Sequence, residues 1–310
     1  QSTMITERIQ YILGYSKKEF TQRNESESDV VKKFKELVAG LDLPRNDDRY
    51  LLRWLRARDF DLLKAEKMLR NHLEWRKKYQ VADLTDDWKP IEVLQKCYPV
   101  GIIGEDKSGS PVWLIRHGKL DIRGILQAVT IEEFVRYTVW MLEKSARIME
   151  RQSMKLGIDV SKQTIIFDLE HWSFQDLVFK PGMDVAMELI KIFEANYPEA
   201  MGYTFVINTP KFFQMAYSLL KPILSETTLS KIKIHGYDKS IWTSDILGVV
   251  PAEVLPKALG GRAVDPDGNE WCESLVPGGG PIPEYYKTGS ESFGDEEEYK
   301  FDDDVMSTFL

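Results

Sequence analysis

The chain has 310 residues, of which 43% are hydrophobic and 29% are charged, and its formal net charge is −8. These proportions are those of a soluble globular protein, and the length accommodates one large domain or two smaller ones. Because general nucleic-acid binding usually requires a surplus of basic residues, the acidic balance disfavours nucleic acid as a partner. Two cysteines without a CxxC pair predict neither a disulfide framework nor a cysteine-bound zinc ion.

The beginning of the chain, residues 1–27, is a polar N-terminal extension. It lacks the apolar core of a signal peptide, and no apolar run in the chain reaches the roughly 18 residues of a membrane span, so we expect a cytoplasmic protein. Ile5, Ile9, Ile12 and Leu13 form a short helical stripe. A packed or frayed terminal helix is the favoured interpretation of this stripe, and a membrane-touching helix is the alternative.

Residues 28–82 are expected to form a small helical unit. Apolar residues recur every three or four positions from Val30 to Tyr79, which predicts helices rather than strands. Pro44 interrupts the chain after the first helix. Asp47 and Asp61 are placed to cap the two helices that follow.

Residues 83–275 alternate between segments typical of strands and of helices. Four segments have the length and apolar character of strands: 112–116, 164–169, 203–208 and 231–234. A Thr-x-x-Glu capping box at Thr130–Glu133 opens a helix that continues to about Lys155, and further helices are predicted over 183–196 and 212–224. Each connection between these strands exceeds a dozen residues, as parallel pairing requires, so the sequence predicts an α/β fold with a mostly parallel sheet.

Residues 276–310 differ in composition from the rest of the chain. The run from Pro277 to Pro283, PGGGPIP, predicts an extended strap over the surface or a linker. Acidic residues then gather between Asp295 and Asp304, and such a run is typical of a solvated tail.

The motifs of common α/β enzymes do not occur in the sequence. GxGxxG, GxxxxGK[ST], GxSxG and HExxH are absent, and the four histidines are scattered. Asp168, Glu170 and His171 cluster at a strand end, where α/β enzymes often hold catalytic groups. A structural role for these three residues is favoured, and a hydrolase that uses them is a remote alternative. We therefore predict no catalytic residue, no metal site and no cofactor, and we expect that the protein is not an enzyme.

Two sequence blocks carry a more specific pattern. The first is LLRWLRARDFD over Leu51–Asp61, and the second includes NYPEAMG from Asn196, KPILS from Lys221 and TLSKI from Thr228. In their order and spacing these blocks resemble the CRAL-TRIO, or Sec-fourteen-like, family of lipid-binding and phosphatidylinositol transfer proteins. The resemblance runs over about residues 30–272.

Within that family, DPDGN over Asp265–Asn269 and GGPIPEYY over Gly279–Tyr286 are similar to the supernatant protein factor, or tocopherol-associated, subgroup. Members of this subgroup carry a further β-sandwich domain of the GOLD type after the lipid-binding domain. We expect that domain to be absent or truncated here, because little chain follows the strap.

The resemblance implies a helical N-terminal unit beside an α/β domain, residues 83–275, whose sheet forms the floor of an apolar lipid cavity. The helix predicted over 212–224 would act as the gate of that cavity, although the same apolar stripe also fits an ordinary core face. The expected cavity and gate residues are Leu142, Ile165, Phe167, Leu169, Phe213, Tyr217 and Leu220.

The family reads phosphatidylinositol with an Arg, Glu, Thr and Lys quartet, and the matching positions here hold all four residue types: Arg58, Glu199, Thr228 and Lys231. Thr228 and Lys231 offer donors to a phosphate. Glu199 can accept hydrogen bonds from inositol hydroxyls, and Arg58 can pair with Glu199. For Arg58 or Glu199 taken alone, a structural ion pair is the favoured interpretation; the four together indicate head-group binding.

The family's second ligand, phosphatidylcholine, fits the sequence less well. The positions of its serine, threonine and tyrosine contacts hold Gln163, Ile165 and Leu142 here. Period-two alternation places Ile165, Phe167 and Leu169 on one strand face. These residues favour a wholly hydrophobic second ligand, such as a tocopherol, squalene, a retinoid or a carotenoid.

The resemblance thus implies an intracellular lipid-transfer protein. Its expected partners are a phospholipid or another hydrophobic small molecule and, transiently, a membrane surface. We expect a bound lipid instead of a cofactor, and a monomer. The alternative is a regulatory interaction module that senses the lipid and engages a partner through the strap or the acidic tail.

Overall fold

The computed structural model describes residues 26–287, and the chain divides into two compact units. The first unit comprises the described residues up to Asp83 together with Ala195–Glu199. The second unit comprises Leu84–Glu194 and the described residues from Ala200 onward.

The first unit consists of helices that begin at local side-chain caps. Its elements are α3 (Glu27–Val38), α4 (Asp48–Arg56), α5 (Leu62–Lys78) and the 3-10 helix η1 (Val81–Asp83). Asp47 accepts a hydrogen bond from Tyr50 N at 3.1 Å, and Asp61 accepts one from Lys64 N at 3.0 Å, so both predicted caps are present. The apolar faces of the three helices bury a common core that includes Phe34, Leu51, Trp54, Leu55 and Leu69.

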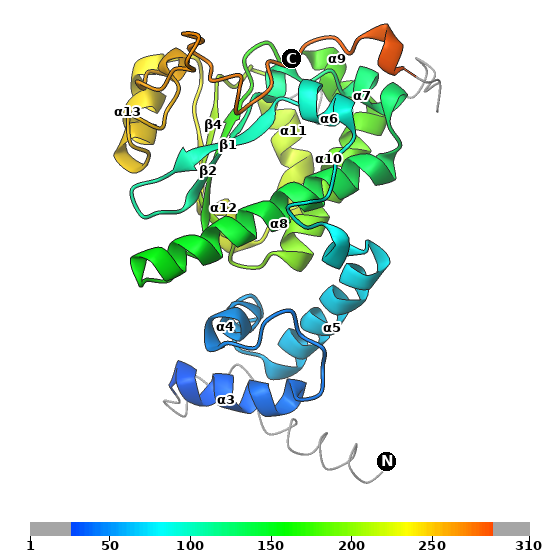
Figure 1. The fold of residues 1–310 in the computed structure, drawn as a ribbon, viewed down its shortest axis with the longest axis vertical. Helices are drawn as coiled ribbons and strands as arrows, with labels where there is room; N and C mark the ends of the chain where they lie inside the picture. Colours follow the sequence, from blue (N-terminus) through cyan, green and yellow to red (C-terminus); the bar gives the residue numbers. More distant parts are fainter. Residues whose placement is uncertain (1–25, 288–310) are drawn as a thin grey trace. The chain divides into compact units, whose positions relative to one another are not determined.

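The second unit combines one sheet with helices on its two faces (Figure 1). Its strands are β1 (Val100–Glu105), β2 (Pro111–Ile115), β3 (Gln163–Asp168), β4 (Met201–Ile207) and β5 (Ile232–Ile234). Its α-helices are α6 (Glu92–Cys97), α7 (Ile122–Ala128), α8 (Ile131–Leu156), α9 (Phe174–Val178), α10 (Lys180–Asn196, which ends in the first unit), α11 (Phe213–Leu220), α12 (Glu226–Leu229) and α13 (Lys239–Val249). Its 3-10 helices are η2 (His117–Lys119), η3 (Lys221–Ile223), η4 (Lys257–Leu259) and η5 (Glu284–Tyr286).

The five strands follow the order β1-β2-β3-β4-β5. β2 to β5 are parallel neighbours, which confirms the predicted mostly parallel sheet. β1 is antiparallel to β2 and was not among the predicted strands. The two are joined by a turn at Asp106–Gly109, where Gly109 N donates to Asp106 O at 2.9 Å. A register shift between Ile102 and Gly104 interrupts the alternation of β1, which hides it from a period-two pattern.

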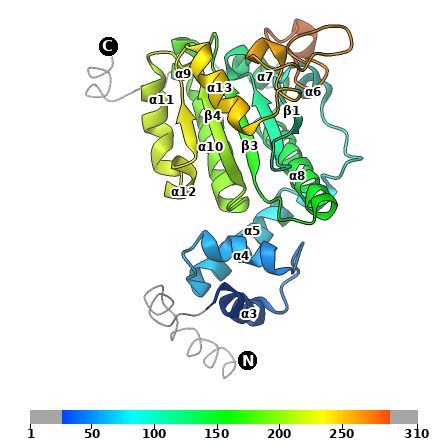
Figure 2. The ribbon, with the colours of Figure 1, turned by 90° about the vertical axis from the view of Figure 1, so that its left-hand side faces the viewer.

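Alternate residues of the strands face two different apolar layers. On one face, Ile166 and Phe205 pack with Trp242 and Ile246 of α13. The other face meets α8, α10 and α11. Figure 1 shows α13 on one side of the strands and α10 and α11 on the other, and Figure 2 looks onto the face that α13 covers.

One helix prediction in this unit needs correction. The gate helix expected over 212–224 is α11, which ends at Leu220 and continues as the 3-10 helix η3. Pro222 lies within η3, and a proline there provides no backbone donor for a longer α-helix. Helix α13 was not predicted, although Asp238 caps it by accepting from Ser240 N at 3.0 Å. The long helix with the predicted Thr130 capping box is present as α8.

The Pro/Gly strap packs on the second unit as far as the structure describes it. Ile282 is buried in the core beside Ile125, and its backbone N donates to Asp121 Oδ2 at 2.9 Å. Gly280 N donates to Lys119 O at 2.8 Å. The Ile5–Leu13 stripe and the acidic tail lie outside the described residues.

Candidate functional site

The expected cavity face is an apolar cluster between β3, β4 and α11. Leu169, Val206 and Phe213 form its buried centre, and Phe167 and Tyr217 pack against them. The rings of Phe213 and Tyr217 are stacked with centroids 5.9 Å apart. Four of the predicted cavity and gate residues therefore meet in one place.

This cluster is less completely covered than the opposite face of the sheet. Among the described residues it has three buried members and five that are only partly buried: Phe167, Trp172, Tyr217, Ile232 and Ile234. The cluster beneath α13 has twelve buried members and four that are partly buried. Apolar area that stays in contact with water can still be covered by a hydrophobic ligand.

The other predicted cavity residues lie in different surroundings. Ile165 is buried in the neighbouring core with Tyr137 and Met141 of α8. Leu220 packs in a separate cluster around Met183, although the sequence placed it on the same face as Phe213 and Tyr217. Leu142 is partly buried on α8.

Gln163 belongs to a buried polar network. Its Oε1 accepts hydrogen bonds from Trp113 Nε1 at 3.1 Å and from Ser145 Oγ at 2.8 Å. Trp113 Nε1 also lies 3.2 Å from Ser145 Oγ. Both lone pairs of the Gln163 carbonyl are therefore occupied by protein donors.

Thr204 contributes a buried hydroxyl that the sequence pattern does not indicate. In register it lies between Ile165 of β3 and Ile232 of β5, and it is 2% exposed. Its Oγ1 has no hydrogen-bond partner among residues 26–287. Such a group is costly in an apolar environment, so it is a candidate contact for a polar atom of a ligand.

Thr228 lies in a compact turn with Ser225, Lys231 and Glu194 of α10. Lys231 N donates to Thr228 O at 3.0 Å, which holds the two predicted head-group residues together. Thr228 Oγ1 donates to Glu194 Oε1 at 2.5 Å. Sequence spacing gives no signal for Glu194, because 34 positions separate it from Thr228.

Arg58 and Glu199 belong to the first unit, whereas Thr228 and Lys231 belong to the second. Arg58 follows α4, and its Nη1 donates to Ala57 O at 2.7 Å. Glu199 is partly buried and has a φ of 59°, in the left-handed region that favours glycine. A non-glycine residue held in this conformation suggests that its side chain has a role.

The carboxyl ends of the strands form a second polar centre. Asp168 Oδ1 accepts hydrogen bonds from Asn208 Nδ2 at 2.8 Å and from Glu170 N at 3.0 Å, and burial raises the pKa of this carboxyl group. Glu170 thus contacts Asp168 through its backbone, and His171 is exposed. Both hydrogen bonds to Asp168 Oδ1 come from the loops that follow β3 and β4.

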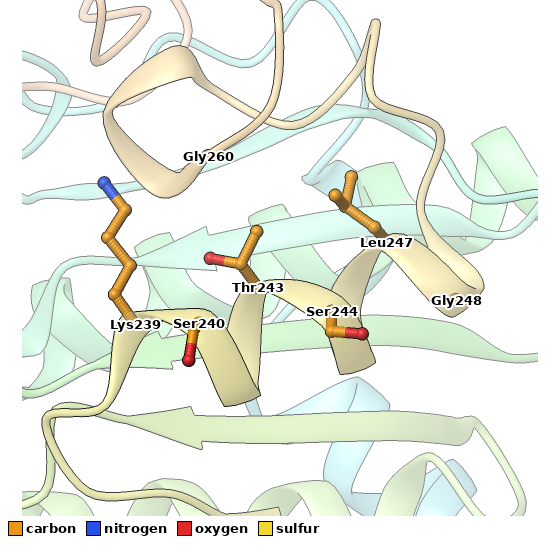
Figure 3. A pocket seen from close by; sticks show the side chains of 7 residues that line it. All are labelled: Lys239, Ser240, Thr243, Ser244, Leu247, Gly248 and Gly260. Atoms are coloured by element: carbon orange, nitrogen blue, oxygen red, sulfur yellow. The ribbon is translucent and has the colours of Figure 1, made fainter.

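An open groove of about 740 Å³ lies along α13, away from the predicted cavity face (Figure 3). Its lining consists of Lys239, Ser240, Thr243, Ser244, Leu247, Gly248 and Gly260. Lys239 Nζ donates to Ala258 O at 2.8 Å, and Thr243 Oγ1 donates to Leu259 O at 3.2 Å. These donors are already paired, and the groove is open to solvent.

Residues 95–261 match the model of the CRAL/TRIO domain, and residues 17–71 match the model of the CRAL/TRIO N-terminal domain. The first match covers more than half of the chain. The chain belongs to the CRAL/TRIO family.

A solved structure described as the crystal structure of Sfh5 has the same fold. It is 21% identical to this chain, covers 85% of it and 95% of its own length, and superposes with a TM-score of 0.63. The α/β fold with an N-terminal unit that the sequence predicted is thus the CRAL-TRIO fold. Proteins of this family bind lipids, and lipid binding is therefore the general function of this chain.

Two further properties concern only the described residues. No helix within residues 26–287 combines the length and the apolar character that crossing a membrane requires. The same part of the chain holds no group of three or more His, Cys, Asp or Glu side chains arranged to bind a metal ion.

Proposed function

We propose that this protein takes one lipid from a membrane, covers its chains at the α11 face of the sheet, and releases it at another membrane. The observation that carries the proposal is the incompletely covered cluster around Leu169, Val206 and Phe213. A diacyl lipid has about 30 methylenes, each worth about 0.8 kcal/mol on leaving water, so unassisted passage through water is slow. A carrier that closes over the chains removes that barrier, and α11 is the proposed gate.

Phosphatidylinositol is the proposed phospholipid. Lys231 and Thr228, which are joined by a backbone hydrogen bond, supply an ammonium and a hydroxyl donor suited to a phosphate. For Arg58 and Glu199 the proposal rests on the resemblance to the family quartet. The left-handed backbone at Glu199 supports a role for its side chain.

The proposed second ligand is wholly hydrophobic, such as a tocopherol, squalene, a retinoid or a carotenoid. Ile165 lies in an apolar core, and the Gln163 carbonyl is occupied by Trp113 and Ser145. Neither position offers the hydroxyl that the family uses for choline phospholipids. We therefore expect weaker uptake of phosphatidylcholine than of phosphatidylinositol.

Transfer between vesicles tests this function. Purified protein should accelerate movement of fluorescent phosphatidylinositol from donor to acceptor vesicles at substoichiometric concentration. Lys231→Ala combined with Glu199→Ala should abolish this transfer and spare binding of tocopherol. Lys233→Ala is the matched control, because Lys233 lies on β5 and pairs with Asp245 at 3.6 Å.

Three results would contradict the proposal. If the folded double variant lost binding of both phosphatidylinositol and tocopherol, the two ligands would not depend on separate residues. Equal transfer of phosphatidylcholine and phosphatidylinositol, without uptake of any apolar ligand, would refute the assigned lipids. Stoichiometric binding without accelerated transfer would identify a lipid-sensing module instead of a carrier.

A further inference from the structure

The carboxylate of Glu194 accepts the hydroxyl that Thr228 would offer to a phosphate in the proposed head-group site. Its Oε1 accepts the Thr228 hydroxyl at 2.5 Å, and its Oε2 lies 3.3 Å from Ser225 N, a longer contact. Glu194, Ser225, Thr228 and Lys231 all belong to the second unit, so this arrangement is complete within one compact body.

The hydroxyl protons of this turn form a chain that ends on Glu194. Ser225 Oγ accepts from Thr228 N at 3.2 Å and lies 2.9 Å from Thr228 Oγ1. A hydroxyl has one proton to donate, and Thr228 gives its proton to Glu194. Ser225 therefore donates to Thr228, and a phosphate that took the Thr228 proton would have to displace the carboxylate.

The negative charges of the Glu194 carboxylate and of a phosphate make their competition for the Thr228 hydroxyl stronger. A phosphodiester and an ionised carboxylate are both anions, and two anions cannot share one donor at hydrogen-bond distance without strong repulsion. Thr228 is only 6% exposed, so water screens this repulsion poorly. Lys231 is the positive charge nearest in sequence, next to Thr228 through their backbone hydrogen bond.

We propose that Glu194 is a specificity-determining residue that holds the Thr228 hydroxyl until the phosphate of an anionic lipid head group replaces it. This inference rests on the proposed head-group role of Thr228 and Lys231. Glu194 lowers the affinity for the anionic lipid, and it gives the Thr228 hydroxyl an acceptor when the lipid leaves. The carboxylate therefore favours release of the phospholipid and has no effect on a neutral, wholly hydrophobic ligand.

Glu194→Gln tests the inference, because the amide keeps one oxygen that accepts the Thr228 hydroxyl and removes the charge. The substitution also replaces the oxygen that accepts the longer hydrogen bond from Ser225 N with an NH2 group. The expected result is a roughly fivefold higher affinity for vesicles containing phosphatidylinositol, with slower release, and unchanged binding of tocopherol. Glu188→Gln is the matched control, since Glu188 is an exposed glutamate on the same helix. Glu194→Ala should raise the affinity in the same direction, which keeps the test valid if one variant folds poorly.

Water-soluble phosphates distinguish the two sources of the anion. Inorganic phosphate and glycerophosphoinositol, added separately to Glu194→Gln, should compete weakly with vesicle-bound phosphatidylinositol. A variant that gains affinity for inorganic phosphate and none for the lipid would overturn the inference. A folded variant with lower melting temperature and unchanged lipid affinity would also overturn it, because Glu194 would then be only a structural partner of the turn.

The proposed function fails through a different experiment. Lys231→Ala that leaves phosphatidylinositol binding intact refutes the head-group assignment itself, and with it this inference. Lys231→Ala that weakens binding while Glu194→Gln fails to strengthen it refutes the inference alone.

Discussion

His72 Nδ1 lies 3.1 Å from Asn196 Oδ1, although 124 positions separate the two residues in the chain. His72 is 4% exposed, and its ring lies against the indole of Trp54 with centroids 4.7 Å apart. Burial lowers the pKa of His72 to about 4, while the hydrogen bond to Asn196 opposes that shift and the charges of Arg76 and Arg53 add to it. The contact joins the segment Ala195–Glu199 to the helical core within the first unit.

The first prediction concerns acid stability. The folded pKa of His72 is about 4 and the unfolded value is 6.5, so the unfolded chain binds more protons between these values. The free energy of unfolding should therefore fall as pH drops from 6.5 towards 4, by about 3 kcal/mol from this residue alone. Urea unfolding at pH 7.5, 5.5 and 4.5 measures the loss.

His72→Gln is the variant for comparison, because glutamine keeps a side-chain donor and does not titrate in this range. Its stability should depend less on pH than that of the unmodified protein. Some dependence should persist, since burial also lowers the pKa of His117 to about 4. Parallel stability curves for the two proteins would contradict the assignment to His72.

The second prediction contrasts two buried threonines on neighbouring strands. Thr164 Oγ1 donates to Asp106 Oδ2 at 2.8 Å, whereas Thr204 Oγ1 has no partner among the described residues. Thr204→Val should raise the free energy of unfolding of lipid-free protein by about 1 kcal/mol, because it removes an unpaired buried hydroxyl. Thr164→Val should lower it by about 1–3 kcal/mol, because it leaves the Asp106 carboxylate short of a donor.

Thermal unfolding of both variants gives the comparison directly. If the free energy of unfolding rises in Thr204→Val and falls in Thr164→Val, the result supports the assignment of the unpaired hydroxyl to Thr204. If Thr204→Val is instead destabilised as much as Thr164→Val, the Thr204 hydroxyl already has a hydrogen-bond partner in the folded protein. Thr204 is then no longer a candidate contact for a ligand.

The third prediction separates strain from function at Glu199. Its φ of 59° costs a non-glycine residue about 1 kcal/mol, so Glu199→Gly should stabilise the protein by roughly that amount. The same variant should lose phosphatidylinositol binding. Glu199→Ala removes the side chain without relieving the backbone, so it should lose binding and gain no stability. A glycine variant that binds the phospholipid normally would remove Glu199 from the head-group site.

The fourth prediction concerns the segment that follows η4. Arg116 is 4% exposed, stacks over the Trp271 ring at 4.0 Å from its centroid, and pairs with Glu273 at 3.0 Å. Glu273→Gln should lower the free energy of unfolding by about 1–3 kcal/mol, because a buried guanidinium loses its counter-charge. Glu270→Gln removes an exposed pair with Lys257 and should cost less than about 1 kcal/mol. Equal losses in chemical denaturation would show that the Arg116 pair is no stronger than a surface pair.

Local interactions account for what could be predicted. The caps at Asp47 and Asp61 and the Thr130 capping box each link residues three positions apart, so the sequence alone identifies the helices that they begin. The parallel strands were recognisable because apolar runs of strand length are separated by long connections. By contrast, β1 was not predicted, because a register shift interrupts the alternation of its side chains between the two faces of the sheet.

What the sequence by itself determined is the helical unit, the mostly parallel sheet, the CRAL-TRIO family and the apolar face of β3. The tertiary structure decided which groups meet: it pairs Thr228 with Glu194, leaves the Thr204 hydroxyl without a partner within residues 26–287, and groups Leu220 apart from Phe213. The physical reason is the separation along the chain of the residues that interact. A cap or a strand pattern depends on neighbours within a few residues, whereas the partner of a buried polar atom is chosen by the packing of elements far apart in the chain.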